Sequence, residues 1–292
     1  MPAMLITFCH NNFAIIITLG KTRQHIGNKL VFIVYSTQDE VSRNSAAALM
    51  AQESLREAQP IGGMRHFLMG HTDVLELGTR HLDSDFLDST VSTDCIIFLS
   101  RHSSTAGVPA FTVHPEGNWS AEAKIGGRPR TLSVASPPWM LRVLSSMKRN
   151  NTTGIPVTYE ATHHGPLLST PSLYAEIGGN QDVWADKGLA SVLSRSVVEA
   201  IDTEVAYDKV ALGIGGLHYA DKFTRLALEG KFAFGHIMPK YYAGEVGMIE
   251  QAISRSIPRP DVAAIEWKSL KSNQRDVIIA KLDELGLDHV RV

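Results

Sequence analysis

The sequence predicts an α/β fold: a three-layer α/β/α arrangement around a mostly parallel, mixed central sheet. Apolar runs of strand length alternate with helical patterns through most of the 292 residues, which favours strands joined by helical crossovers. Several of those runs, such as "CIIFLS" at 95–100, are continuously apolar, as is typical of strands covered on both faces. We therefore expect one α/β domain over residues 29–292, preceded by a poorly matched N-terminal extension, residues 1–28.

The elements follow in a regular order. The first strand, residues 29–37, leads into a helix over 37–58 whose capping box places Thr37 at the N-cap, with Glu40 reaching back. Further strands are expected at 66–70, 74–77, 95–100, 109–114, 131–136, 155–162, 171–178, 209–216, 231–237, 261–267 and 288–292. Further helices are expected at 138–149, 182–201, 221–230, 247–255 and 274–285.

Composition limits the possible functions. A net charge of −2 argues against a protein that coats nucleic acid or membrane by bulk charge. The two cysteines, Cys9 and Cys95, stand among apolar residues as small buried side chains, which suits a reducing cytoplasm and excludes a cysteine-rich zinc site. The apolar start of the chain is too short and too interrupted for a membrane span and lacks the features of a signal peptide.

Histidines gather where predicted strands end. Six of the twelve stand at or just after such ends: His102, His114, His163, His164, His218 and His236. Because the loops beyond strand ends form the binding crevice of an open α/β sheet, we expect these imidazoles to meet. Glu160 precedes the histidine pair in "TYEATHHGP", and Glu176 lies on a strand that runs toward the same region.

Imidazole and carboxylate groups together indicate a zinc site, acid–base chemistry, or both. Glu160 could ligate a metal or act as general base. Lys240 could stabilise an oxyanion or hold a phosphate, and Tyr219 could donate a hydrogen bond. The glycines of "ALGIGG" do not form a dinucleotide-binding fingerprint, and no serine stands in a nucleophile elbow.

The motifs "SRHSS", "TVHPEGNW", "TYEATHHGP", "YAEIG", "ALGIGGLHYADKFTRLALEG" and "FGHIMPKY", in this order from about Ser100 to Tyr241, resemble the archaeal and plant type of D-aminoacyl-tRNA deacylase. The resemblance implies a phosphorylase/hydrolase-like fold and a cytoplasmic esterase that removes D-amino acids of many kinds from tRNA, in translation quality control. It also implies two zinc ions per subunit. We expect a monomer without a membrane or protein partner.

Site residues follow from the motifs and that resemblance. The candidate catalytic residues are Glu160, His163, His164, His218 and Lys240. The candidate metal ligands are His102, His114, His163, His164, His236 and Glu160. The candidate tRNA-binding residues are Ser103, Gly117, Asn118, Gly215, Gly216, Tyr219 and Lys222. Candidate phosphate contacts are Lys124, Arg128, Arg130, Lys148, Arg149, Lys222 and Arg225.

Three alternatives stay open at this point. The site could work without metal, with the pocket positioning the ester and a ribose hydroxyl assisting. The chain could be a zinc aminopeptidase or amidohydrolase that acts on small substrates. It could also bind a nucleotide or the end of a tRNA without catalysis.

Overall fold

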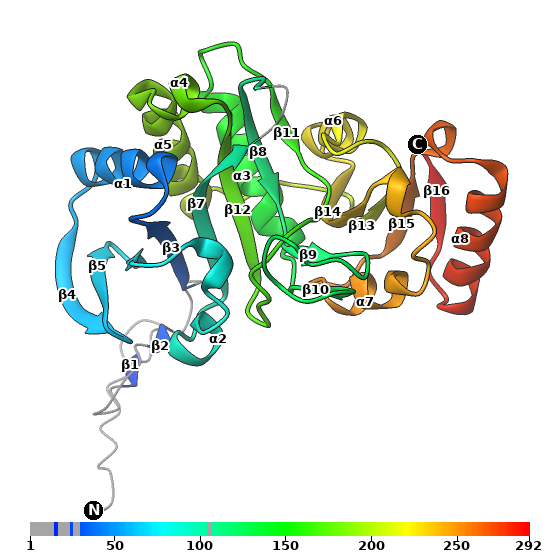
Figure 1. Ribbon diagram of the computed structural model, residues 1–292, viewed down its shortest axis with the longest axis horizontal. Coiled ribbons are helices and arrows are strands. Elements are labelled where there is room, and N and C mark those ends of the chain that lie inside the picture. The colour runs from blue at the N-terminus through cyan, green and yellow to red at the C-terminus, as the bar shows by residue number, and fades with distance from the viewer. Residues whose placement is uncertain (1–14, 17–23, 26–29, 104–106) are drawn as a thin grey trace, which may run out of the picture.

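The computed structural model describes residues 15–16, 24–25, 30–103 and 107–292, whose strands form two main sheets (Figure 1). The larger sheet has the spatial order β11 (Val157–Tyr159), β8 (Ala110–His114), β12 (Ser172–Gly179), β7 (Cys95–Ser103), β3 (Val31–Ser36), β6 (Thr72–Leu77), β5 (Met64–Met69) and β4 (Arg56–Ile61). The smaller sheet has the order β14 (Phe232–Met238), β13 (Lys209–Ile214), β15 (Val262–Ile265) and β16 (His289–Arg291). Two short ribbons pair β1 (Ile15–Ile16) with β2 (Gln24–His25) and β9 (Gly117–Asn118) with β10 (Thr131–Leu132).

The predicted mostly parallel mixed sheet is confirmed. Four of the seven strand pairs in the larger sheet are parallel, and all three in the smaller sheet are. The helices are α1 (Glu40–Gln52), α2 (Leu87–Thr90), α3 (Pro137–Asn150), α4 (Gln181–Trp184), α5 (Lys187–Asp202), α6 (Asp221–Leu228), α7 (Met248–Ser254) and α8 (Ser272–Glu284). Short 3₁₀ turns occupy His81–Asp83, Lys240–Tyr242 and Trp267–Ser269.

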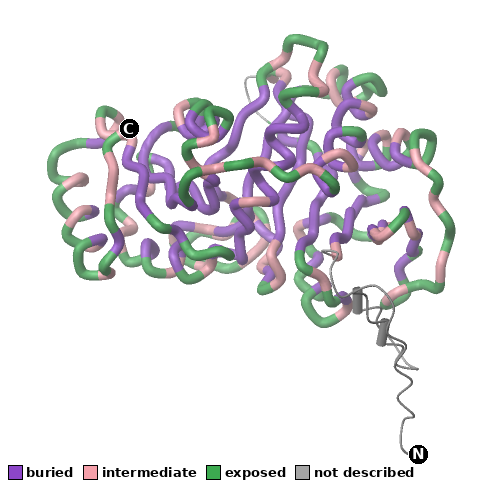
Figure 2. The backbone as a smooth tube through the Cα atoms, turned by 180° about the vertical axis from the view of Figure 1, so that it is seen from behind, coloured by how far each residue is buried: buried purple, intermediate pink, exposed green. Residues whose placement is uncertain are grey.

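Helix α3 joins the two sheets. It contacts β8 and β11 of the larger sheet and β14 of the smaller one, so that one apolar cluster runs through both. Helices α1 and α5 complete the cover on the same face of the larger sheet, whereas α7 and α8 cover the outer face of the smaller sheet. Buried backbone fills the centre of the molecule, and exposed segments surround it (Figure 2).

Several local predictions are wrong. Asp39, rather than Thr37, is the N-cap of α1, because its side chain accepts the Ser42 amide at 2.9 Å. The first helix ends at Gln52, and residues 56–61 form the edge strand β4. The helix expected over 182–201 is divided, since Asp186 caps a new helix with its carboxylate. Of the strand expected over 131–136, only Thr131–Leu132 forms a regular strand, and Ala135 adds isolated bridges to Ser172 and Ser256.

The larger sheet is also less evenly covered than three full layers require. Phe32 and Phe98 on its second face contact Leu87 of the short helix α2 and Leu168, rather than a long helix. Cys95 is buried, as expected, whereas Cys9 and most of the expected extension lie outside the described residues. In the part of the chain that the structure describes, no helix is long and apolar enough to cross a membrane.

Candidate active site at the junction of the two sheets

The segment that follows β11 joins the two sheets. The Glu160 amide donates to the Val113 carbonyl of β8 at 3.0 Å, which continues the larger sheet by one residue. The next two amides turn toward the smaller sheet: Ala161 donates to the carbonyl of His218, in the loop after β13, at 2.8 Å, and Thr162 to that of Ile237, in β14, at 3.0 Å. This backbone therefore holds the Glu160 side chain at the junction.

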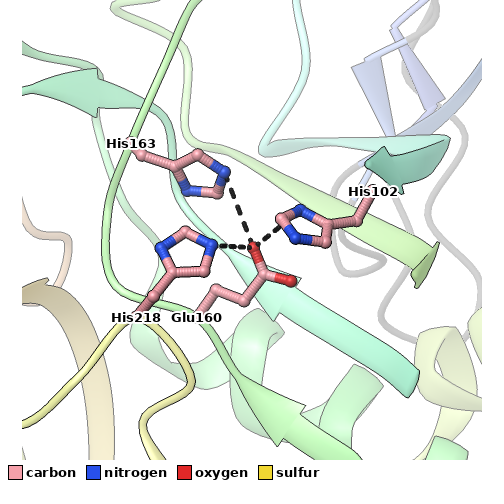
Figure 3. A group of neighbouring side chains, drawn as sticks. All are labelled: His102, Glu160, His163 and His218. Carbon is pink, nitrogen blue, oxygen red and sulfur yellow. Dashed lines mark ion pairs between the residues drawn. The ribbon is translucent and has the colours of Figure 1, made fainter. Parts of the chain in front are cut away.

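One carboxylate oxygen of Glu160 gathers three imidazoles (Figure 3). Its Oε2 lies 3.1 Å from Nε2 of His218, 3.2 Å from Nδ1 of His102 and 3.5 Å from Nε2 of His163. The Glu160 side chain is fully buried, and neither of its oxygens accepts a hydrogen bond of regular geometry from the described residues. Histidines at or after the ends of three different strands, β7, β11 and β13, thus meet at one oxygen, as their positions in the sequence predicted.

The imidazoles around Glu160 favour its ionised form. Burial raises its pKa, but the hydrogen bond from His218 and the charges of His114 and His102 outweigh burial and lower the pKa to about 2. Burial lowers the pKa of His218, but the hydrogen bond to Glu160 more than compensates, so that the pKa of His218 is raised. Glu160 is therefore an anion at neutral pH and a weak proton acceptor.

A second group lies beside the first. It comprises His114 of β8, His163 and His164, and Oε2 of Glu176 in β12 lies 3.2 Å from His114 Nε2. In each of the three imidazoles, Nδ1 lies close to a backbone carbonyl, at 3.2 Å from Pro115, 2.9 Å from Ala161 and 2.7 Å from Gly165. A ring that donates Nδ1–H to a carbonyl presents an unprotonated Nε2, which is the form that binds metal.

Burial keeps these three imidazoles neutral. It lowers the pKa of His114 and of His164 to about 4 and that of His163 well below its usual range. His164 has a φ of 44°, in the left-handed region, and its carbonyl accepts the Gly117 amide at 2.7 Å. A non-glycine residue held there indicates that the site requires this orientation of the backbone.

Three other carboxyl groups have raised pKa values: those of Glu176, Glu116 and, because of its burial, Asp39. Burial and the nearby charge of Glu160 raise the pKa of Glu176 to about 7. Burial raises the pKa of Glu116 to about 8, although Ser172 donates to its Oε2 at 2.9 Å. A carboxyl group with a pKa near 7 is well suited to take and return a proton, so Glu176 fits a general base better than Glu160 does.

The structure does not bring His236, a predicted metal ligand, into the cluster. Its Nε2 lies 3.1 Å from the Ser133 carbonyl and 3.2 Å from the Arg255 carbonyl, and its Nδ1 lies 3.2 Å from the Thr162 hydroxyl. Both ring nitrogens thus have protein partners. His236 braces the backbone behind the site.

Several predicted tRNA contacts support the backbone. The Asn118 amide donates to the Gly126 carbonyl, and a Cβ at Gly117 would lie 2.6 Å from a Leu132 side-chain carbon. Side chains at Gly215 or Gly216 would collide with Ser269 or Glu266. The three glycine positions require glycine for packing. A contact with tRNA stays a prediction for these glycines and for Asn118.

The remaining candidates divide between the site and the surface. Tyr219 pairs with Glu160 through a backbone bridge, and its ring centroid is 6.0 Å from that of His102. Lys240 is exposed and Lys222 half-buried, and neither lines the cavity described below. Four of the predicted phosphate contacts form ion pairs with nearby glutamates: Lys124, Arg130, Arg149 and Arg225.

A cavity of about 610 Å³ opens over the cluster. It is lined by Ser36, Gln38, Asp39, Arg80, His81, Leu82, Ser100, Arg101, His102, Ser103, Ile125, His163, His164, Tyr174, Glu176 and His218. The sequence interpretation found His102, His163, His164, His218 and Ser103 but did not single out His81, and it overlooked Asp39 and Arg101. The same strand-end rule could have found both, since they follow or end the strands β3 and β7.

Comparison with known proteins places the chain among hydrolases of charged tRNA. Residues 89–290 match the family model described as D-aminoacyl-tRNA deacylase. Two curated D-aminoacyl-tRNA deacylases illustrate the similarity: that of Pyrococcus abyssi is 39% identical over 89% of this chain and 98% of its own length. That of Ignicoccus hospitalis is 41% identical over 70% of this chain and 84% of its own.

A solved structure supports the fold. The crystal structure of a conserved protein of unknown function superposes with a TM-score of 0.82, at 29% identity, over 91% of this chain and 95% of the other. The family match covers more than half of the chain, and the curated relatives match over nearly their whole length. The chain belongs to the D-aminoacyl-tRNA deacylase family.

Proposed function

We propose that this protein hydrolyses the ester bond between a D-amino acid and the 3′ end of a tRNA, releasing the free amino acid and the tRNA. The observation that carries the proposal is the Glu160 carboxylate, held by three imidazoles beneath a 610 Å³ cavity in a chain of this family. A cavity of this size leaves room around an aminoacyl group, which favours broad side-chain tolerance. We further propose a cytoplasmic monomer.

We also propose that the cluster holds zinc. The ligand atoms of His102, Glu160, His163 and His218 all lie within 4.8 Å of one another, and they are nitrogen and oxygen donors of the kinds that zinc takes. Of these, His102, Glu160 and His163 would hold the ion, and His218 stays free for proton transfer. The neutral ring of His163 and the buried oxygens of Glu160, which have no hydrogen-bond partner of regular geometry among the described residues, fit the same role. Bound zinc supplies Lewis acidity toward the ester carbonyl and the attacking water.

A second ion has a less complete donor set. His163 offers only Nε2, because its Nδ1 is paired with Ala161, so it serves one ion. His114 and His164 then remain for the other. We propose a stoichiometry of two on this basis, and metal analysis of the purified protein tests it.

The chain's own residues handle the protons in this proposal. Glu176, with a pKa near 7, takes a proton from the attacking water. His218, whose pKa is raised and whose side chain is about one-third exposed, gives a proton to the departing ribose oxygen. Glu160 stays ionised throughout and keeps the imidazoles oriented.

Hydrolysis of D-tyrosyl-tRNA and L-tyrosyl-tRNA by the purified protein tests the activity. We expect selective loss of the D-ester, abolished in His164→Ala. Lack of D-selective turnover in protein loaded with zinc would refute the proposal, and cleavage of small peptides instead would indicate the aminopeptidase alternative. Retention of D-ester turnover after complete removal of metal would refute the zinc role and leave the metal-free mechanism.

A further inference from the structure

The cavity has a second acidic end, away from the Glu160 cluster. Asp39 lies at the start of α1, is 8% exposed and lines the same cavity as His102 and His163. The proposed hydrolysis gives it no role. A buried carboxylate that faces a binding cavity has a cost in free energy unless a cation or several donors stabilise it.

The donors to Asp39 leave room for a cation. Its Oδ1 accepts the Ser42 amide at 2.9 Å, and its Oδ2 accepts the Arg101 amide at 3.2 Å and lies 3.5 Å from the Ser100 hydroxyl. A carboxylate has about four acceptor positions, so these contacts do not exhaust it. The Arg101 guanidinium lies over the Trp184 ring and forms an ion pair with Asp39, but its Nε is 3.7 Å from Oδ2, beyond hydrogen-bond range, so it leaves acceptor positions unused.

Asp39 is also at a suitable distance from the reacting groups. Ser100 and His102 stand two residues apart on the buried face of β7, about 7 Å along the strand. Asp39 contacts Ser100, and His102 contacts Glu160. The gap between Asp39 and the cluster is therefore on the order of 7 Å. The α-amino group of an aminoacyl ester is one carbon away from its carbonyl, so that this span together with a hydrogen-bond contact at each end fits the gap.

We propose that Asp39 binds the protonated α-amino group of the substrate and so acts as a specificity residue. This inference rests on the proposed function. Because the ester is held at the cluster and the ammonium at Asp39, the α-hydrogen and the side chain exchange places between the two enantiomers. Only one enantiomer can then direct its side chain away from the sheet, toward the open cavity.

The test compares Asp39→Asn with wild type on two tRNA esters, D-phenylalanyl and D-phenyllactyl. The second replaces the ammonium with a hydroxyl of similar size. Asparagine caps a helix about as well as aspartate, so α1 keeps its N-cap. Asp186→Asn is the matched control, since Asp186 caps α5 in the same way but lies outside the cavity lining.

We expect wild type and Asp186→Asn to share a preference for the ammonium ester, and Asp39→Asn to reduce it by about 10- to 100-fold in kcat/KM, as for a charged hydrogen bond. Comparing ratios between variants cancels the intrinsic reactivity of the esters. An unchanged preference in Asp39→Asn would overturn the inference.

A binding measurement separates this inference from the hydrolysis proposal. Adenosine bearing the same two groups through a stable 3′-amide is titrated into each protein. Loss of the ammonium preference in Asp39→Asn supports the inference even without turnover, and an equal preference in all three proteins refutes it even if hydrolysis is confirmed.

Discussion

His163 and His236 are both largely enclosed histidines at the sheet junction, yet their rings serve different ends. His163 Nδ1 is paired with the Ala161 carbonyl, which leaves Nε2 directed at Glu160, 3.5 Å away. His236 has partners at both nitrogens and contacts no carboxylate within the described residues. Position at a strand end and burial are therefore insufficient to identify a ligand. One ring nitrogen must also remain directed into the site.

The largest expected effect separates the two histidines by activity. His163→Ala should lower kcat/KM for the D-ester by about 10³-fold, because it removes a ligand atom from the group that stabilises the transition state. Bound zinc, measured by mass spectrometry of the purified protein, should fall with it while the circular dichroism spectrum is kept. Full zinc content in an inactive variant would contradict the ligand role.

Glu176→Gln tests whether the two buried carboxyl groups of the site, Glu160 and Glu176, have different roles. We expect about a 10²-fold loss of kcat, because an amide cannot take the proton. In the wild type, activity should rise as pH increases through about 7, where Glu176 loses its proton, and this limb should vanish from the pH profile of the variant. A retained limb would assign it to another group.

His236→Ala should act on stability. It leaves the Ser133 and Arg255 carbonyls without their donor and creates a void, at a cost of about 2–3 kcal/mol in the free energy of unfolding. Urea denaturation measures this, and kcat/KM at low temperature should stay close to wild type. Loss of zinc from the folded variant would restore His236 as a ligand.

Glu116→Gln has the smallest expected effect and depends on pH. The folded-state pKa of Glu116, about 8, exceeds its ordinary value of 4.5, so the folded chain binds this proton more tightly and loses stability as pH rises from 4.5 to 8. The variant should therefore be more stable than wild type by about 1–2 kcal/mol at pH 9, with no gain at pH 4. Thermal unfolding at both pH values checks this, and an equal shift at both would exclude titration as the cause.

Much of the site follows from the chain's pattern of strands. The strand-end rule located His102, His114, His163, His164 and His218, which all belong to the groups that could hold a metal. His236 does not join these groups because its partners, Ser133 and Arg255, lie 103 and 19 residues away, and only the folded chain brings them together. Asp39 was overlooked because the segment was interpreted as the start of a helix and not as a strand end.

The sequence predicted the fold about as fully as it predicted the site. Alternating strands and helices indicated the mixed sheet, but not its division into two, because the pairing of strands far apart in sequence leaves no local pattern. The break at Asp186 lay within a continuous helical periodicity, and only its capping contacts with Gly188 and Leu189 distinguish it.

The backbone of residues 160–162 has a consequence for how the activity could be divided. Glu160 hydrogen-bonds to one sheet, Ala161 and Thr162 to the other, and His102 and His218 come from opposite sides. No contiguous half of the chain therefore contains a whole site. A protein cut in the loop between α5 and β13 should be inert as separate fragments and regain function only when they reassociate, so that turnover would report directly on fragment complementation.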